Sequence, residues 1–278
     1  MAAAAEHALD PHGRGPVRFV DTGEDGWRPV VFFGGLGTDV GAFYETEFAR
    51  EFRERLCLRV ISVERNGFGM TPFDPPRGYA DAVDDVVSVL ENLRVRRFAV
   101  VAISGGAPYA AALAARAPHR VLSLHLAAAA AGPLAASCGT VAVLYAQPAQ
   151  LAADPALAHE WLLLTSEPLP DLSGLYAPAY LYWGYDDDVV PLEHVRAWRR
   201  ILPRVAALRG YRGEGHDVHY RHWKQILLDV AGLGTQHPPG DGIGGRYPPA
   251  DSLGTQHPPH DGHGSALNGD AAALQGEA

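Results

Sequence analysis

The chain has 278 residues, of which 47% are hydrophobic and 20% are charged, and this fits one α/β domain or two small ones. The net charge of −9 argues against a nucleic acid as partner. The longest apolar region, residues 121–137, is rich in Ala and interrupted by His125, Gly132 and Pro133, so it does not predict a membrane span.

The two cysteines, Cys57 and Cys138, are too few for a disulfide framework and lack the spacing of metal ligands. We therefore expect both to be buried apolar side chains. Residues 1–10 contain Glu6 and no basic segment, which is unlike a secretory signal. These features predict a soluble, cytoplasmic protein.

Apolar runs of strand length alternate with helical patterns along most of the chain. Residues 17–20 alternate in polarity and predict a strand at a sheet edge, whereas the continuous apolar run 29–33 is typical of a buried parallel strand. The alternation predicts a mostly parallel sheet with helices on both faces. Further strands are expected at 58–63, 98–102, 120–126, 179–183 and 205–209, and helices at 39–56, 79–93, 107–117, 191–201 and 218–230.

Two segments interrupt this alternation. One lies within the expected domain of residues 1–231, and the other is a tail that follows this domain. Residues 127–176 are irregular apart from the dense apolar cluster 161–164, which predicts a cap insertion at about 128–176. Residues 232–278 are rich in Gly, Pro and His, repeat one seven-residue motif at 233–239 and 253–259, and predict a disordered tail. The tail histidines are the candidate metal ligands, but no Cys and no cluster of carboxylates accompanies them in the sequence. No metal or cofactor is therefore predicted. These histidines are His237, His257, His260 and His263.

The most informative stretch is Ala102-Ile103-Ser104-Gly105-Gly106, between a predicted strand and an Ala-rich helix. Small residues two positions before and after a serine permit the sharp strand-to-helix turn that exposes a nucleophile. Pro108 suits the first turn of the following helix. We expect Ser104 at the apex of this turn, although a Ser-Gly-Gly sequence before a helix can also serve only as a cap.

Four motifs in order make the chain resemble the α/β-hydrolase fold family, in its small, capped, single-domain type. Residues 33–37 correspond to the family's oxyanion loop, with Phe33 in place of the usual His, and residues 65–69 to its Arg-Pro-Gly-aromatic-Gly turn. Ser104 lies on the nucleophile elbow. Residues 184–191 and 213–216 resemble the loops that carry the acid and the histidine, in the family's order.

The resemblance implies a catalytic triad of Ser104, Asp187 and His216. Asp187 is chosen among three adjacent aspartates by its spacing from Gly184 and Pro191. Asp186 is then expected in a solvated turn, and Asp188 as a helix cap. The family's other position for the acid is excluded, because no Asp or Glu lies between Arg97 and Ala153. The implied oxyanion hole consists of backbone N–H groups of Gly105 and of Gly35 or Leu36.

These residues predict a hydrolase that acts on a small-molecule ester, thioester or lactone through an acyl-enzyme intermediate. Hydrolases of C–C bonds and aminopeptidases use the same constellation, so they remain alternatives. A binding protein or cofactor-free lyase with this fold is a further alternative. The apolar cluster 161–164 fits either an acyl site or simple packing. The oligomeric state is not predicted.

Overall fold

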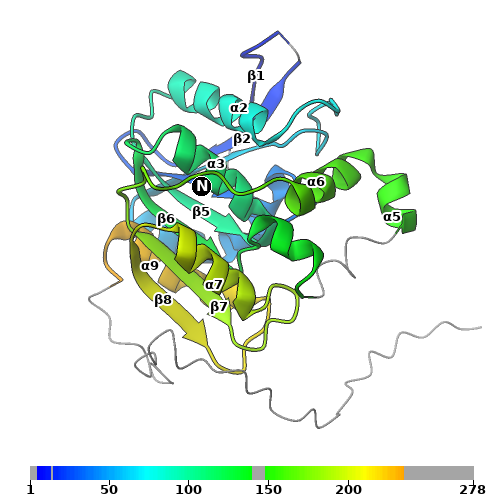
Figure 1. Cartoon of the computed structure of the whole chain (residues 1–278). Helices are drawn as coiled ribbons and strands as arrows, with labels where there is room; N and C mark the ends of the chain where they lie inside the picture. Colours follow the sequence, from blue (N-terminus) through cyan, green and yellow to red (C-terminus); the bar gives the residue numbers. More distant parts are fainter. Residues whose placement is uncertain (1–4, 14, 140–147, 235–278) are drawn as a thin grey trace, which may run out of the picture. The chain divides into compact units, whose positions relative to one another are not determined.

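The computed structural model describes residues 5–13, 15–139 and 148–234 (Figure 1). They all belong to one unit, which spans Met1–Ile243. Of the predicted tail at 232–278, only residues 232–234 are described, and its four histidines lie outside the described residues.

The centre of the unit is a single eight-stranded sheet. Its strands are β1 (Ala5–Leu9), β2 (Val17–Thr22), β3 (Arg28–Phe33), β4 (Leu58–Val63), β5 (Phe98–Ile103), β6 (Val121–Ala127), β7 (Ala179–Gly184) and β8 (Val205–Tyr211). They lie side by side in the order β1-β2-β4-β3-β5-β6-β7-β8 (Figure 1). The strands from β4 to β8 in this order are parallel, and β1 and β2 run antiparallel to their neighbours. The predicted mostly parallel sheet is confirmed.

Strand β1 lies outside β2, so the prediction that residues 17–20 form the edge of the sheet is wrong. The two strands pair from Ala5 opposite Asp21 to Leu9 opposite Val17. The ring of His7 stacks on that of Phe19 at 5.2 Å. This strand was missed because its five residues carry too few large apolar or β-branched side chains to give a strand pattern.

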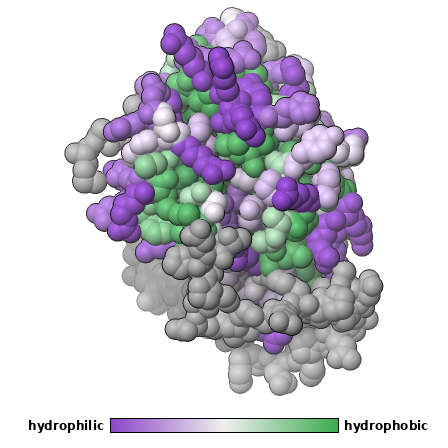
Figure 2. All heavy atoms as spheres, turned by 90° about the vertical axis from the view of Figure 1, so that its left-hand side faces the viewer, coloured by the Kyte–Doolittle hydropathy of each residue, from purple (hydrophilic) through white to green (hydrophobic). Residues whose placement is uncertain are grey.

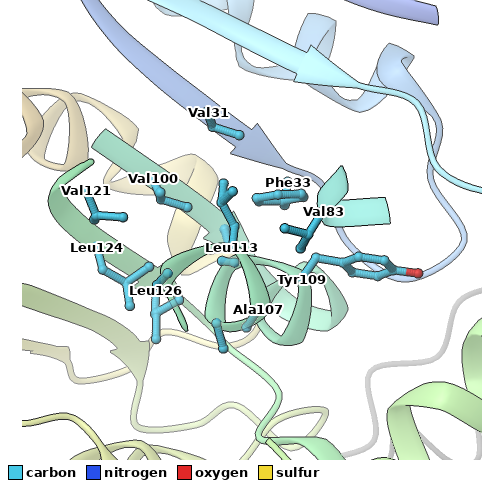
Figure 3. Packing of buried hydrophobic residues seen from close by; sticks show 14 of the residues in the cluster. Val31, Phe33, Val83, Val100, Ala107, Tyr109, Leu113, Val121, Leu124 and Leu126 are labelled. Carbon is cyan, nitrogen blue, oxygen red and sulfur yellow. The ribbon is translucent and has the colours of Figure 1, made fainter. Parts of the chain in front are cut away.

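Helices cover both faces of the sheet. On one face lie α2 (Tyr79–Asn92), α3 (Ala107–Arg116) and α7 (Leu192–Ile201), and on the other η1 (Val40–Ala49), α1 (Arg50–Arg55) and α9 (Trp223–Ala231). Because α3 is mostly Ala, it packs closely on the sheet, with Leu113 among Val31, Val100 and Leu124 (Figure 3). This face of the sheet supports the turn that carries Ser104.

Two helices differ from their predicted extents. The segment 39–56 forms the 3₁₀ helix η1 followed by α1, and Asp39 begins it by accepting a hydrogen bond from the Gly41 N–H at 2.7 Å. The segment 218–230 forms α8 (Val218–Arg221) and α9, with a break at His222. Backbone angles of −109° and 22° at His222 interrupt the helix.

The segment between β6 and β7 contains helices that the sequence pattern did not predict: η3 (Gly132–Ala136), α5 (Pro148–Ala153) and α6 (Pro155–Ser166). Asp154 begins α6 by accepting a hydrogen bond from the Leu157 N–H, and Pro155 occupies the first turn. The apolar cluster divides on this helix: Leu163 joins the main core, Leu164 joins a smaller cluster, and Leu162 is exposed.

The expectation that both cysteines are buried is wrong. Cys57 is exposed in the turn between α1 and β4, where its φ of 52° places it in the left-handed region. Cys138 is half-buried, and neither cysteine forms a disulfide among the described residues.

Hydrophilic side chains cover much of the face seen from the left of Figure 1, with hydrophobic ones between them (Figure 2). In the described part of the chain, the helices are too short or too polar to cross a membrane.

Candidate active site

Four loops meet where the parallel strands end. Residues 34–38 (the β3 loop) follow β3, Ser104 follows β5, Asp187 follows β7, and His216 follows β8. Because these strands are parallel and adjacent in the order β3-β5-β6-β7-β8, their carboxyl ends share one edge of the sheet. Residues distant in sequence are therefore brought together at this edge.

Ser104 lies in a strained turn with a φ of 50°, which is uncommon for a residue with a side chain. The turn presses against the end of β3: a Cβ at Gly106 would lie 2.3 Å from the Gly34 carbonyl oxygen and 2.8 Å from that of Phe33. Ala102, on the other side of the turn, is fully buried. The small residues around Ser104 are thus required by close packing.

The three residues of the predicted triad form a hydrogen-bonded chain. The His216 Nε2 lies 3.1 Å from the Ser104 Oγ, and its Nδ1 lies 3.0 Å from the Asp187 Oδ2. A carboxylate can only accept, so the proton of the neutral imidazole belongs on Nδ1, and Nε2 accepts from the Ser104 hydroxyl. In this arrangement, the ring can take a proton from Ser104.

Asp187 is held in place by backbone groups. Its Oδ1 accepts hydrogen bonds from the N–H groups of Val189 at 3.0 Å and Val190 at 2.8 Å, and the residue is 4% exposed. Asp186 and Asp188 are exposed. The expected cap role of Asp188 is wrong, because the N-cap position of α7 is occupied by Pro191 and no side chain of the described residues caps it.

The predicted oxyanion residues lie against the nucleophile turn. A Cβ at Gly35 would lie 3.8 Å from the Ser104 Cβ, and a Cβ at Gly105 would lie 3.0 Å from the Leu36 backbone nitrogen. Glycine at position 105 therefore allows the β3 loop to approach the turn closely. Phe33 stands where the family usually has a histidine. Its ring stacks on that of Tyr109, with the ring centroids 6.1 Å apart.

Two buried histidines near the site were missed by sequence reasoning. The His194 Nδ1 accepts the Ala131 N–H at 2.9 Å, which ties α7 to the segment after β6. The neighbouring N–H of Ala130 donates to the Ser104 carbonyl at 3.0 Å. The ring of His219 lies 5.9 Å from that of His216, and burial, reinforced by the charge of His216, lowers its pKa to about 4. His219 is therefore neutral at neutral pH.

Within the described ranges, there is no group of three or more His, Cys, Asp or Glu side chains that could hold a metal ion.

Comparisons with known proteins agree with this fold. A family model described as "alpha/beta hydrolase fold" matches residues 28–158. A thermophilic esterase from Thermogutta terrifontis is similar in structure, with a TM-score of 0.62, 19% identity, and coverage of 84% of this chain and 99% of the other. A bromoperoxidase from Bacillus anthracis has a TM-score of 0.64 and 16% identity, covering 84% and 100%.

A third similar structure is Est816, described as an N-acyl homoserine lactone degrading enzyme, with a TM-score of 0.62, 19% identity, and coverage of 82% and 100%. The comparison with curated proteins gave no match. At these identities the solved structures show the fold. The sheet order, the turn at Ser104, the matching family model and these structures together show that the chain has the α/β-hydrolase fold.

Proposed function

We propose that this chain is a serine hydrolase that cleaves a small-molecule ester, thioester or lactone through an acyl-enzyme intermediate. The observation that carries the proposal is the continuous hydrogen-bonded chain from the Ser104 Oγ through His216 to a buried Asp187. This is the arrangement that turns a weakly nucleophilic hydroxyl into a nucleophile at neutral pH.

In the first half-reaction, the Ser104 Oγ attacks the substrate carbonyl while His216 Nε2 takes the hydroxyl proton. Asp187 holds the ring in the required tautomer and stabilises the imidazolium. The carbonyl oxygen becomes negative, and the N–H groups of Gly105 and of Gly35 or Leu36 stabilise it, each by about 3 kcal/mol. His216 then gives its proton to the leaving group, and the acyl group stays on Ser104.

In the second half-reaction, water takes the place of the leaving group. His216 Nε2 removes a proton from the water, whose oxygen attacks the acyl carbonyl, and the same N–H groups stabilise the second oxyanion. Collapse of this intermediate returns the proton to the Ser104 Oγ and releases the acid. One histidine thus alternates between base and acid.

The substrate class is supported by the structural neighbours, among which are an esterase and an enzyme that degrades an N-acyl homoserine lactone. Next to the site, Leu36, Leu157 and Leu164 belong to one buried apolar cluster. This cluster is consistent with an apolar acyl or alkyl group near Ser104. The same triad also supports C–C hydrolysis and aminopeptidase activity, so a substrate panel is needed to choose among them.

The proposal is tested by labelling the wild-type protein and Ser104→Ala with a fluorophosphonate probe. We expect labelling of the wild type alone, because the probe forms a covalent bond only with an activated serine. A panel of p-nitrophenyl acyl esters, lactones and aminoacyl anilides then identifies the substrate class. Absence of labelling in a folded wild-type protein would favour a binding protein or cofactor-free lyase.

A further inference from the structure

We propose that Arg65 and Glu160 are positioning residues that form a buried clamp on the β3 loop, through which helix α6 holds the oxyanion hole in its working geometry. The inference rests on the proposed function, because the β3 loop contains Gly35 and Leu36. Neither residue of the clamp touches the substrate in this proposal.

Arg65, in the turn after β4, holds the carbonyl side of the loop. Its Nη2 donates to the Gly35 carbonyl at 2.6 Å, the Thr38 carbonyl at 2.6 Å and the Thr38 Oγ1 at 3.0 Å. Its guanidinium also lies over the rings of Phe68 and Tyr109. The Nη2 group thereby fixes two peptide carbonyls of one short loop, while Nη1 of the same planar guanidinium faces Glu160.

Glu160 approaches the same loop from α6, and it is 2% exposed. Its Oε2 accepts the Gly37 N–H at 2.6 Å, and its Oε1 lies 2.7 Å from the Arg65 Nη1. The hydroxyl of Tyr109 points away from the apolar cluster in Figure 3, and its interaction with Glu160 opposes the rise that burial causes in the pKa of this carboxyl group. The carboxylate is thus held between the β3 loop and Arg65.

Fixing the Gly35 carbonyl determines where the oxyanion donors point. Carbonyl and N–H point in opposite directions in a trans peptide unit, so the bond from Arg65 to Gly35 sets the direction of the Leu36 N–H. The bond from the Gly37 N–H to Glu160 fixes the loop two residues further along. Since oxyanion stabilisation depends on donor position to within a fraction of an ångström, this restraint acts directly on the reaction rate.

A role in stability alone does not account for the pair. Desolvation of two charges offsets most of their attraction, and a well-packed apolar pair of similar volume is often as stable. What an apolar pair cannot supply is the four directed hydrogen bonds to the loop backbone and Thr38. The Leu157 side chain of α6 packs on the same loop, since a Cβ at Gly37 would lie 3.0 Å from its Cδ1. Helix α6 therefore meets the loop through both charged and apolar contacts.

The test compares three conservative variants with the wild type. Glu160→Gln keeps the side-chain size but turns an amide toward Arg65, and Arg65→Lys keeps the charge but loses the fork. Asp85→Asn is the matched control, because it removes one charge of a similarly buried pair, that of Asp85 on α2 with Arg77. The readouts are the rate of Ser104 labelling, kcat and KM on the best ester, and hydrogen exchange of residues 34–38.

For both clamp variants we expect labelling and kcat to fall about 10- to 100-fold, with KM within about threefold, and exchange of the loop amides to rise. The control should keep wild-type rates even if its unfolding midpoint falls. Should Glu160→Gln fail to fold, Arg65→Lys carries the same expectation.

The outcomes separate this inference from the proposed function. Labelling of the wild type at Ser104, with unchanged rates and unchanged loop exchange in both clamp variants, would overturn the clamp alone. A rate loss as large in Asp85→Asn would likewise overturn it, because any buried ion pair would then have the same effect. A wild type that is not labelled would contradict the proposed function itself.

Discussion

At the scale of single residues, Gly106 shows how little space the nucleophile turn leaves. A methyl group there would lie 2.3 Å from the Gly34 carbonyl oxygen, so the turn or the β3 loop must move to accept it. We expect Gly106→Ala to lower the free energy of unfolding by about 1–3 kcal/mol and to slow Ser104 labelling. Urea denaturation and labelling kinetics measure the two effects.

The matched control is Gly174→Ala, because a Cβ at Gly174 would have no heavy atom of the described residues within 4 Å. It should change stability by no more than about 0.5 kcal/mol. If the two variants shared one denaturation midpoint, the close packing inferred at the turn would be contradicted.

Sequence reasoning located Ser104, Asp187 and His216 because each follows a strand in a motif of fixed spacing. That spacing singled out Asp187, and the structure adds that only Asp187 of the three aspartates is buried. Their catalytic roles stay predictions. Glu160 could not be found in this way, because its contacts depend on how α6 packs against loops distant in sequence.

At the scale of elements, α6 offers two leucines, two residues apart, with opposite environments. Leu164 is 1% exposed and shares an apolar cluster with Leu36 and Val190, whereas Leu162 is 58% exposed. We expect Leu164→Ala to cost about 2–5 kcal/mol of unfolding free energy and to slow labelling, because the cavity lies beside the β3 and acid loops.

Leu162→Ala, the same chemical change on the same helix, should stay within about 0.5 kcal/mol of the wild type. Thermal or urea denaturation of the pair gives the comparison. Equal losses in both variants would mean that α6 contributes through its helix propensity and not through its buried side.

The parallel strands and helices such as α2 and α7 could be predicted, because a buried strand or a one-sided helix leaves a clear apolar period. Helix α6 could not be predicted in this way. It buries Leu157 and Leu164 beside the catalytic loops and Leu163 in the main core, so its apolar residues lie on more than one side of the helix and leave no clear period. The break at His222 and the short edge strand β1 leave equally weak patterns. These are the places where tertiary packing, and not local preference, determines the structure.

At the scale of the whole molecule, a buried polar network joins three strands and a helix on the face opposite α3. The His125 Nδ1 lies 2.9 Å from the Tyr182 hydroxyl, which donates to Asp229 at 2.8 Å, and Arg209 donates to the same carboxylate at 2.6 Å. The ring of His125 also stacks on Tyr180, with centroids 4.6 Å apart. The network links β6, β7, β8 and α9.

Burial, assisted by the charges of Arg28 and Arg209, lowers the pKa of His125 from 6.5 to about 3. Between these two values, the unfolded chain binds a proton at this position that the folded chain does not. The free energy of unfolding therefore falls as the pH drops from 6.5 toward 3, and at pH 4.5 His125 alone accounts for a loss of about 2–3 kcal/mol.

Urea denaturation at pH 7 and pH 4.5 tests this, with His125→Gln as the variant and the exposed His119→Gln as its control. Carboxylates and His219 contribute in all three proteins to the loss of unfolding free energy between pH 7 and pH 4.5. The difference in this loss between the wild type and His125→Gln therefore isolates the contribution of His125. We expect the loss between the two pH values to shrink by about 2–3 kcal/mol in His125→Gln and to stay unchanged in His119→Gln. An equal loss in all three proteins would mean that His125 takes up its proton without unfolding, through a local opening of the network between β6 and α9.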